Sequence, residues 1–278
     1  CQFLGSSNTL INPNALRNMA YKQPEYNKEG VTVYEKAQEG NTYVTTVDVS
    51  RGVGIDYSAF VVFDVTKMPF KVVCKYKSND ISPLMYPTII NRMCSHYNNA
   101  YILVEINDIG QQVADILNND IEYENLLSTT WKGRSGQVLG GGFGGGTTLG
   151  ARTTGQLKRL GCSNLKNLIE ENKLIIQDFD IINELSTFVA RKGSFEAEEG
   201  SHDDLAMCLV MFAWLGGQPY FKELTENDIR QKLYKEKMQA IEDELTPFGF
   251  INNDVNEGSE TFVDSEGDRW VVVESSSW

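Results

Sequence analysis

The sequence predicts an α/β fold, in which helices flank a mixed β-sheet. Three runs rich in β-branched and aromatic residues, 42–50, 58–66 and 70–78, follow one another with short turns between them. Such closely spaced strands are typical of an antiparallel meander. Helical and strand patterns then alternate, and this order adds parallel strands through right-handed crossovers.

The elements after the meander begin with a helix over 82–97, for which Ser82 is the expected N-cap, with Pro83 at its first position. A fourth strand covers 100–108, and Asp108 is the expected cap of the helix that follows. The remaining predicted elements are a helix over 109–120, a strand over 124–130, a glycine-dense loop over 131–152, a helix in two pieces over 153–172, a short strand over 173–178, a helix over 180–190, a strand or hairpin over 193–201 and an apolar helix over 202–215.

The 278 residues are predicted to form three parts. Residues 1–40 lack sustained periodicity and an initiator Met, so we expect a linker or the tail of a preceding domain. Residues 41–222 hold the α/β domain. Residues 223–278 contain 14 acidic and 5 basic residues and form an acidic, partly helical C-terminal region. No apolar run is long enough to predict a membrane span.

The composition narrows the possible metal chemistry. The five cysteines are odd in number and contain no C-x-x-C pair, and only two histidines are present. The cysteines argue against a disulfide framework or a zinc site and for a reducing, cytosolic setting, and the two histidines exclude a multi-histidine metal site. A metal ion would therefore have carboxylate ligands, which favours Mg²⁺ or Mn²⁺.

Acidic residues recur where apolar segments begin or end. Asp48 ends the first strand, Glu105 ends the fourth, and Asp203 and Asp204 open the apolar helix. If the first and fourth strands are parallel neighbours, Asp48 and Glu105 share one edge of the sheet. Converging carboxylates repel one another unless cations lie between them. Two divalent ions about 4 Å apart would relieve this repulsion and activate water for attack on phosphorus.

Each acid also has a structural explanation. Asp48 is suited to an Asx turn before Arg51, and Asp203 and Asp204 are suited to capping a helix. Glu105 is harder to explain in this way, because Val104 and Ile106 flank it in a strand that is predicted to be buried.

The net charge of −13 disfavours a DNA partner at first sight, but basic residues are concentrated in one stretch. Residues 131–168 contain no acid, and a solvated surface is the alternative to DNA binding there. The candidate DNA-binding residues are this stretch's Lys132, Arg134, Arg152, Lys158, Arg159 and Lys166, together with Arg51. The glycine run "GGGFGGG" is not followed by Gly-Lys-Ser/Thr, so it does not predict a nucleotide-binding P-loop.

Four stretches, "TTVDVSRGVGIDYSAFVVFDV", "YILVEINDIGQQVADIL", "LKNLIEENKLIIQD…INELSTFV" and "SHDDLAMCLVMFAWL", resemble the C-terminal nuclease domain of the large terminase subunit of tailed bacteriophages. The resemblance implies a ribonuclease-H-like fold and a metal-dependent endonuclease that cuts concatemeric DNA. Its acidic triad falls on Asp48, Glu105 and one of Asp203 and Asp204, with Asp203 preferred.

The resemblance also implies an N-terminal ATPase motor, a portal protein and a small terminase subunit as partners, double-stranded DNA as substrate, and a place at the procapsid portal in the host cytoplasm. Other hypotheses are a non-catalytic docking module of the packaging motor, a structure-selective nuclease or resolvase of the same fold, and a sugar-kinase or actin-like ATPase. The last is disfavoured, because no second Asp-Gly phosphate motif is found.

Overall fold

The computed structural model describes residues 8–52, 54, 56–133, 136–140, 146–191, 193–223, 225, 261–263 and 269–271. The chain divides into two units, Cys1–Gln231 and Lys232–Trp278. The described part of the second unit is an antiparallel pair of strands, β13 (Thr261–Val263) and β14 (Arg269–Val271). Most of the predicted acidic, partly helical region over 223–278 lies outside the described residues.

The first unit is built on a mixed sheet with the strand order β1-β2-β5-β4-β3-β6, in which β10 also pairs with β5. The predicted meander is present as β3, β4 and β5, and β6 lies parallel to β3. The strands of this sheet are β1 (Tyr26–Lys28), β2 (Val31–Val33), β3 (Tyr43–Asp48), β4 (Ser58–Asp64), β5 (Phe70–Ser78), β6 (Tyr101–Val104) and β10 (Leu174–Ile175).

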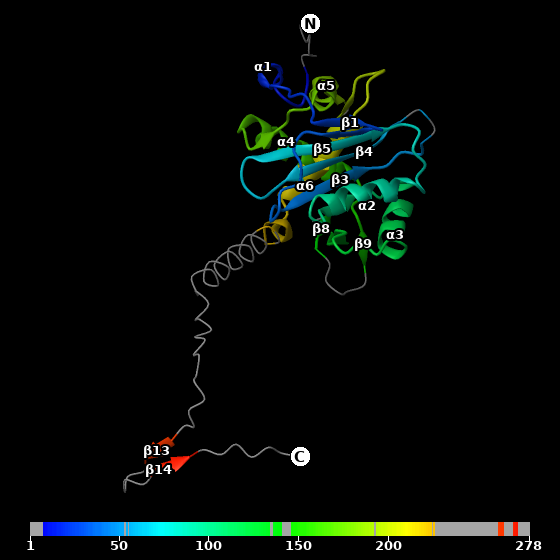
Figure 1. The fold of residues 1–278 in the computed structure, drawn as a ribbon. Coiled ribbons are helices and arrows are strands. Elements are labelled where there is room, and N and C mark those ends of the chain that lie inside the picture. Colours follow the sequence, from blue (N-terminus) through cyan, green and yellow to red (C-terminus); the bar gives the residue numbers. More distant parts are fainter. Residues whose placement is uncertain are drawn as a thin grey trace. The chain divides into compact units, whose positions relative to one another are not determined.

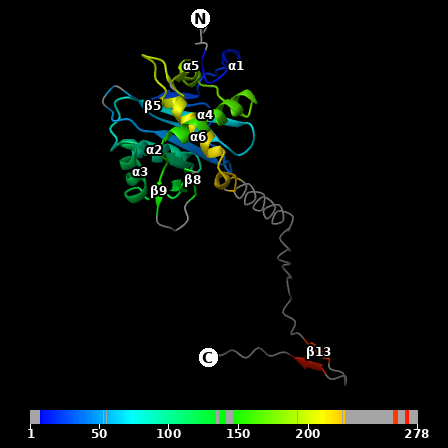
Figure 2. The same ribbon diagram turned by 180° about the vertical axis from the view of Figure 1, so that it is seen from behind.

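Helices cover both faces of this sheet, as the α/β pattern predicts. The helices are α1 (Pro13–Asn18), α2 (Tyr86–His96), α3 (Gly110–Asn119), α4 (Gly155–Glu170), α5 (Phe179–Thr187) and α6 (Asp204–Gly216). Helices α2 and α3 lie against one face, and α4 and α6 lie against the other (Figures 1 and 2). Strands β3, β4 and β6 are buried almost throughout, which explains why their sequences are mostly apolar.

Residues 8–40 belong to this unit, whereas the sequence predicts a linker. Strand β2 pairs with β5, and the Leu10 amide donates to the carbonyl of Phe188. Leu10, Ile11 and Leu16 lie in the core beside α5. Within residues 8–40, strands β1 and β2 and helix α1 are too short to give sustained periodicity, and this is why the sequence pattern does not predict them.

Two helix starts differ from prediction. Helix α2 begins at Tyr86 and places Pro87 in its first turn, while Ser82 supports the preceding turn by accepting from the Leu84 amide. Helix α3 has no side-chain cap, because its N-cap position is Ile109, while Asp108 before it has a positive φ of 48° and accepts from Arg51 instead. Helix α4 is one continuous helix, rather than the two pieces that the sequence predicts.

The predicted fifth strand is divided between two sheets. Leu126 makes one parallel bridge to Ile102 of β6, and the chain then enters a separate three-stranded sheet in the order β8-β7-β9. Its strands are β7 (Ser128–Trp131), β8 (Gln137–Leu139) and β9 (Thr147–Leu149). Gly150 then returns to β6, where a Cβ atom would lie 2.4 Å from the Val104 carbonyl oxygen. Only glycine permits this approach, which seats Ala151 beside Glu105.

The last helix is positioned by close packing and by the sheet. A Cβ atom at Gly161 of α4 would lie 2.4 Å from the Val210 carbonyl oxygen, so α4 and α6 approach closely there. The hydroxyl of Thr46 in β3 donates to the Cys208 carbonyl of α6 at 2.8 Å. A hairpin precedes α6, formed by β11 (Phe188–Arg191) and β12 (Ser194–Ala197). Strand β12 lies within the stretch predicted as a strand or hairpin, whereas β11 replaces the end of the helix predicted over 180–190.

Candidate active site

Asp48 and Glu105 are neighbours across two parallel strands. Val47 of β3 pairs with Val104 of β6, and the Glu105 amide donates to the Val47 carbonyl at 2.8 Å. Asp48 and Glu105 are the next residues on each strand. The two strands are therefore parallel neighbours. Asp48 and Glu105 share one edge of the sheet, as expected for this arrangement.

Both side chains point to the same face of the sheet. Val44 of β3 and Leu103 of β6 belong to the core cluster that contains α4 and α6. Because side chains alternate along a strand, Asp48 and Glu105 share this face with Val44 and Leu103. Asn107 donates to Glu105 Oε1 at 3.0 Å and so orients this carboxylate.

The first turn of α6 adds two more carboxylates. Asp203 occupies the N-cap position without making a side-chain cap, and its Oδ2 accepts from the Ala197 amide at 3.3 Å. Asp204 Oδ1 accepts from the Tyr57 amide at 3.3 Å. The capping role is taken instead by Glu184 of α5, whose Oε2 accepts from the Ala206 amide at 2.9 Å.

The four acids interact electrostatically. Burial, followed by the Glu105 carboxylate, raises the pKa of Asp48 well above its usual range, and Asp204 and Asp203 raise it further. Burial also raises the pKa of Asp204, although Lys77 opposes this shift. Like charges that are held together in this way favour protonation or a bound cation.

Asp48, Asp203 and Asp204 border an open cleft of about 580 Å³. On its rim, the Arg51 guanidinium donates two hydrogen bonds to Asp108, at 2.7 and 2.8 Å. This pairing lowers the pKa of the Asp108 carboxyl. The residues that line the cleft are Asp48, Val49, Ser50, Arg51, Gly52, Asp56, Tyr57, Asp108, Asp203 and Asp204.

The donor set fits a hard divalent cation. It consists of carboxylate oxygens, which Mg²⁺ and Mn²⁺ prefer. One of them, Asp204 Oδ2, is buried and has no hydrogen-bond partner among the described residues. Within the same described part, no three His, Cys, Asp or Glu side chains already stand in a metal-binding arrangement. Ligation would therefore require the side chains to move closer together.

The two structural explanations for these acids are not supported by hydrogen bonding. The turn after β3 is held by Ser50 and Ser58, whose hydroxyls accept from the amides of Gly52 and Ser50. The first turn of α6 is capped by Glu184. Asp64, in contrast, is a turn residue, because it accepts from the Thr66 amide.

The candidate DNA-binding residues have different surroundings. Lys132, Arg152 and Arg159 are exposed, and Arg152 directly follows Ala151, which bridges to Glu105. Lys158 lies 4.0 Å from Asp203, and Lys166 lies 3.9 Å from Glu170. Arg51 is paired with Asp108, and Arg134 lies outside the described residues.

Sequence reasoning missed Lys77 and Glu184. Lys77 of β5 contacts Glu184 Oε1 at 2.5 Å and lies 3.8 Å from Asp204 Oδ2. Burial raises the pKa of Glu184 to about 7, and Lys77 opposes this shift. The available signals were a lone acid in the apolar run "IINELSTF" and the alternation of lysines with buried residues in "VVCKYKS".

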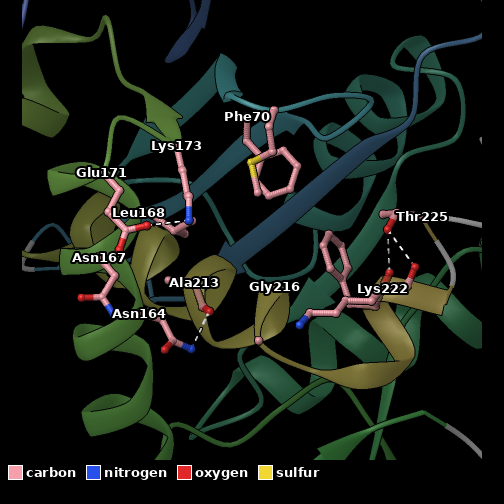
Figure 3. Close-up of a pocket in the computed structure, with 13 residues that line it drawn as sticks. Phe70, Asn164, Asn167, Leu168, Glu171, Lys173, Ala213, Gly216, Lys222 and Thr225 are labelled. Atoms are coloured by element: carbon pink, nitrogen blue, oxygen red, sulfur yellow. Dashed lines mark hydrogen bonds and ion pairs between the residues drawn. The ribbon is translucent and has the colours of Figure 1, made fainter.

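A second cavity, of about 360 Å³, lies at the other end of α6 (Figure 3). It is bordered by Ala213 and Gly216 near the end of α6. Asp204 begins this helix, and at 1.5 Å per residue it lies roughly 18 Å from Gly216 along the helix axis. Asn164 donates to the Ala213 carbonyl at its edge. This cavity is lined by none of the four acids.

Comparison with known proteins identifies the family. The terminase RNaseH-like domain model matches residues 45–213. The chain belongs to this terminase family. The matched residues include Asp48, Glu105, Asp203 and Asp204, and the mixed sheet with flanking helices is the architecture expected of an RNaseH-like domain.

Solved terminase nucleases share this fold. The large terminase nuclease of the thermophilic phage G20c with bound magnesium has a TM-score of 0.58 and 18% identity, over 75% of this chain and 97% of that one. The same nuclease with bound cobalt gives 0.57 and 20%, with the same coverage. The large terminase nuclease domain of Thermus phage P74-26 gives 0.54 and 17%, over 73% and 93%.

Proposed function

We propose that this domain is a divalent-metal-dependent DNA endonuclease of a viral packaging terminase, which cuts concatemeric DNA to packaged lengths. The observation that carries the proposal is the parallel pairing of β3 with β6, which sets Asp48 beside Glu105, facing the N-terminus of α6. The G20c nuclease structures with bound magnesium and with bound cobalt support the choice of a divalent ion.

Asp48, Glu105 and the Asp203–Asp204 pair would hold two Mg²⁺ or Mn²⁺ ions. When bound, such ions supply Lewis-acid chemistry and activate water for in-line attack on a phosphodiester. Asn107 holds the Glu105 carboxylate in one orientation, and Glu184 holds the turn that carries the aspartates. Asp204 Oδ2 accepts no hydrogen bond from any described residue, and this favours Asp204 as a ligand. It would act in addition to Asp203, the residue that the resemblance favours.

Exposed bases beside the acids would position the DNA backbone. Arg152 stands next to the segment that pairs with Glu105, and Gln137 exchanges two hydrogen bonds of 2.8 Å with the Arg152 backbone. Lys132 and Arg159 are also exposed. We assign weaker DNA-binding roles to Arg51, Lys158 and Lys166, because each already has an acidic neighbour.

Family membership supplies the wider setting of this proposal. We infer that the domain acts on double-stranded DNA with an ATPase motor domain, a portal protein and a small terminase subunit, at the procapsid portal in the host cytoplasm. Within the described part of the chain, no helix has the length and apolar character needed to cross a membrane.

The test is plasmid cleavage in Mg²⁺ and in Mn²⁺ by the Asp48→Asn variant. We expect cleavage to be lost, while the metal-free protein melts at a higher temperature because a buried, repelled charge is gone. Asp64→Asn is the matched control, since Asp64 also ends a strand but binds Asn41 outside the cleft. Wild-type cleavage by Asp48→Asn would refute the proposal.

The non-catalytic docking module is the second candidate. It is favoured by one observation, that no three metal-ligating side chains in the described residues are already in place. Comparing Asp203→Asn with Asp204→Asn separates the candidates. Loss of Mn²⁺ binding and of cleavage in either variant supports the nuclease, whereas DNA binding without any metal-dependent cleavage supports the docking module.

A further inference from the structure

Lys77 is a partly buried cation beside Asp204, one of the acids that border the cleft. It lies near the end of β5, its side chain is only 19% exposed, and it points toward α5 and α6. Its ammonium contacts Glu184 Oε1 at 2.5 Å and lies 4.3 Å from the centre of the Tyr57 ring. These contacts hold its charge at a fixed place.

The same ammonium faces the carboxylate of Asp204. Lys77 Nζ lies 3.8 Å from Asp204 Oδ2, and His202 Nδ1 lies 3.9 Å from the same oxygen. Oδ2 is buried and accepts no hydrogen bond from any described residue, whereas Oδ1 accepts from the Tyr57 amide. Lys77 is therefore within electrostatic reach of this oxygen but too far away to satisfy it by a hydrogen bond.

We propose that Lys77 is a positioning residue that sets the metal affinity of the cleft. This inference rests on the proposed nuclease function. Because Glu184 tethers Lys77, the ammonium stays close when a divalent ion approaches Asp204. Its positive charge opposes the ion, so the cleft fills only at a higher metal concentration than its carboxylates alone would require.

Lys75 provides a matched comparison. It lies two residues earlier on the same strand and on the same face, and it is more deeply buried, at 5% exposure. It contacts Asp178 at 2.7 Å and also pairs with Asp180, so it fastens the same helix α5 to the sheet. No ion pair joins it to Asp203 or Asp204 within the described residues.

The experiment measures Mn²⁺ binding to the DNA-free protein by titration calorimetry, with free Mn²⁺ followed by electron paramagnetic resonance. Lys77→Met should bind Mn²⁺ on the order of tenfold more tightly than wild type, given one charge removed at this range. Lys75→Met should stay within about twofold of wild type, and Lys77→Arg should behave like wild type, because it keeps the charge.

Lys77→Met leaves Glu184 buried without its partner, so it is paired with a second variant, the double substitution Lys77→Met/Glu184→Gln, which removes both charges. Tighter Mn²⁺ binding in either variant supports the inference. Equal binding by the Lys77 and Lys75 variants, or weaker binding by the Lys77 variants, overturns it.

Asp48→Asn serves as the reference for the metal site. If wild type binds Mn²⁺ and Asp48→Asn does not, the proposed function stands, whatever the Lys77 variants do. If wild type binds no Mn²⁺, the proposed function fails, and the inference fails with it.

Discussion

The titration of Glu184 makes the stability of the metal-free protein depend on pH. This carboxyl is 4% exposed, and burial raises its pKa from 4.5 to about 7. Below pH 4.5 it is protonated in both the folded and unfolded states, so its full contribution to stability is present there. As the pH rises toward 7, the unfolded chain releases the proton first, and this favours unfolding.

The expected loss follows from the size of the shift. A difference of about 2.5 pH units, at 1.36 kcal/mol per unit, corresponds to about 3 kcal/mol between pH 4.5 and pH 7. This is a large part of the 5–15 kcal/mol that is typical of a domain. The substitution Glu184→Gln keeps an acceptor for the Ala206 amide but does not titrate, so it should remove this pH dependence.

The assay is urea unfolding with a chelator present, at several pH values from 4.5 to 7.5. The quantity to compare is the slope of the unfolding free energy against pH in wild type and in Glu184→Gln. The slope separates titration from the constant cost of losing the Lys77 contact. Equal slopes in the two proteins would refute this account of Glu184.

Two further predictions concern packing and DNA. Gly161→Val should lower the free energy of unfolding by about 1–3 kcal/mol in thermal unfolding, because the new side chain meets the Val210 carbonyl oxygen. The control Gly155→Ala has open space around it and should change stability by only a few tenths of a kcal/mol. Equal melting of the two variants would contradict the packing argument. Arg152→Ala should weaken duplex binding, measured by fluorescence anisotropy, and should reduce the slope of log binding constant against log salt concentration by about 1. The control substitution Lys28→Ala, at an exposed lysine, should leave the affinity and the slope unchanged. An unchanged slope in Arg152→Ala would exclude a phosphate contact.

The sequence was sufficient to predict the layout that brings the first two acids together. β-branched runs with short turns gave the meander, and the alternation that follows gave a parallel fourth strand. Asp48 and Glu105 lie where the first and fourth strands end, so their proximity follows once these strands are parallel neighbours, a condition that the sequence left open and the pairing of β3 with β6 meets. Strand direction and periodicity are local properties, and a single sequence expresses them clearly.

Other features were not predictable, because they depend on contacts between distant segments. Asp108 looked like a helix cap, but its bond to Arg51 required knowing that residues 57 positions apart meet. Strand β2 is only three residues long, so its place beside β5 left no periodic signal. The pairing of Lys77 with Glu184 spans 107 positions, and nothing local marks either residue as a partner.

The position of the aspartates at the start of α6 is determined by the core rather than by a loop. Every residue from Leu205 to Leu215 is buried, so this helix carries a charged side chain only at its start. The Thr46–Cys208 hydrogen bond and the contact at Gly161 fix its position along the sheet. Asp203 and Asp204 are thereby held opposite Asp48 despite their mutual repulsion. Packing of the core stabilises this arrangement, and a cation in the cleft would relieve the repulsion that remains.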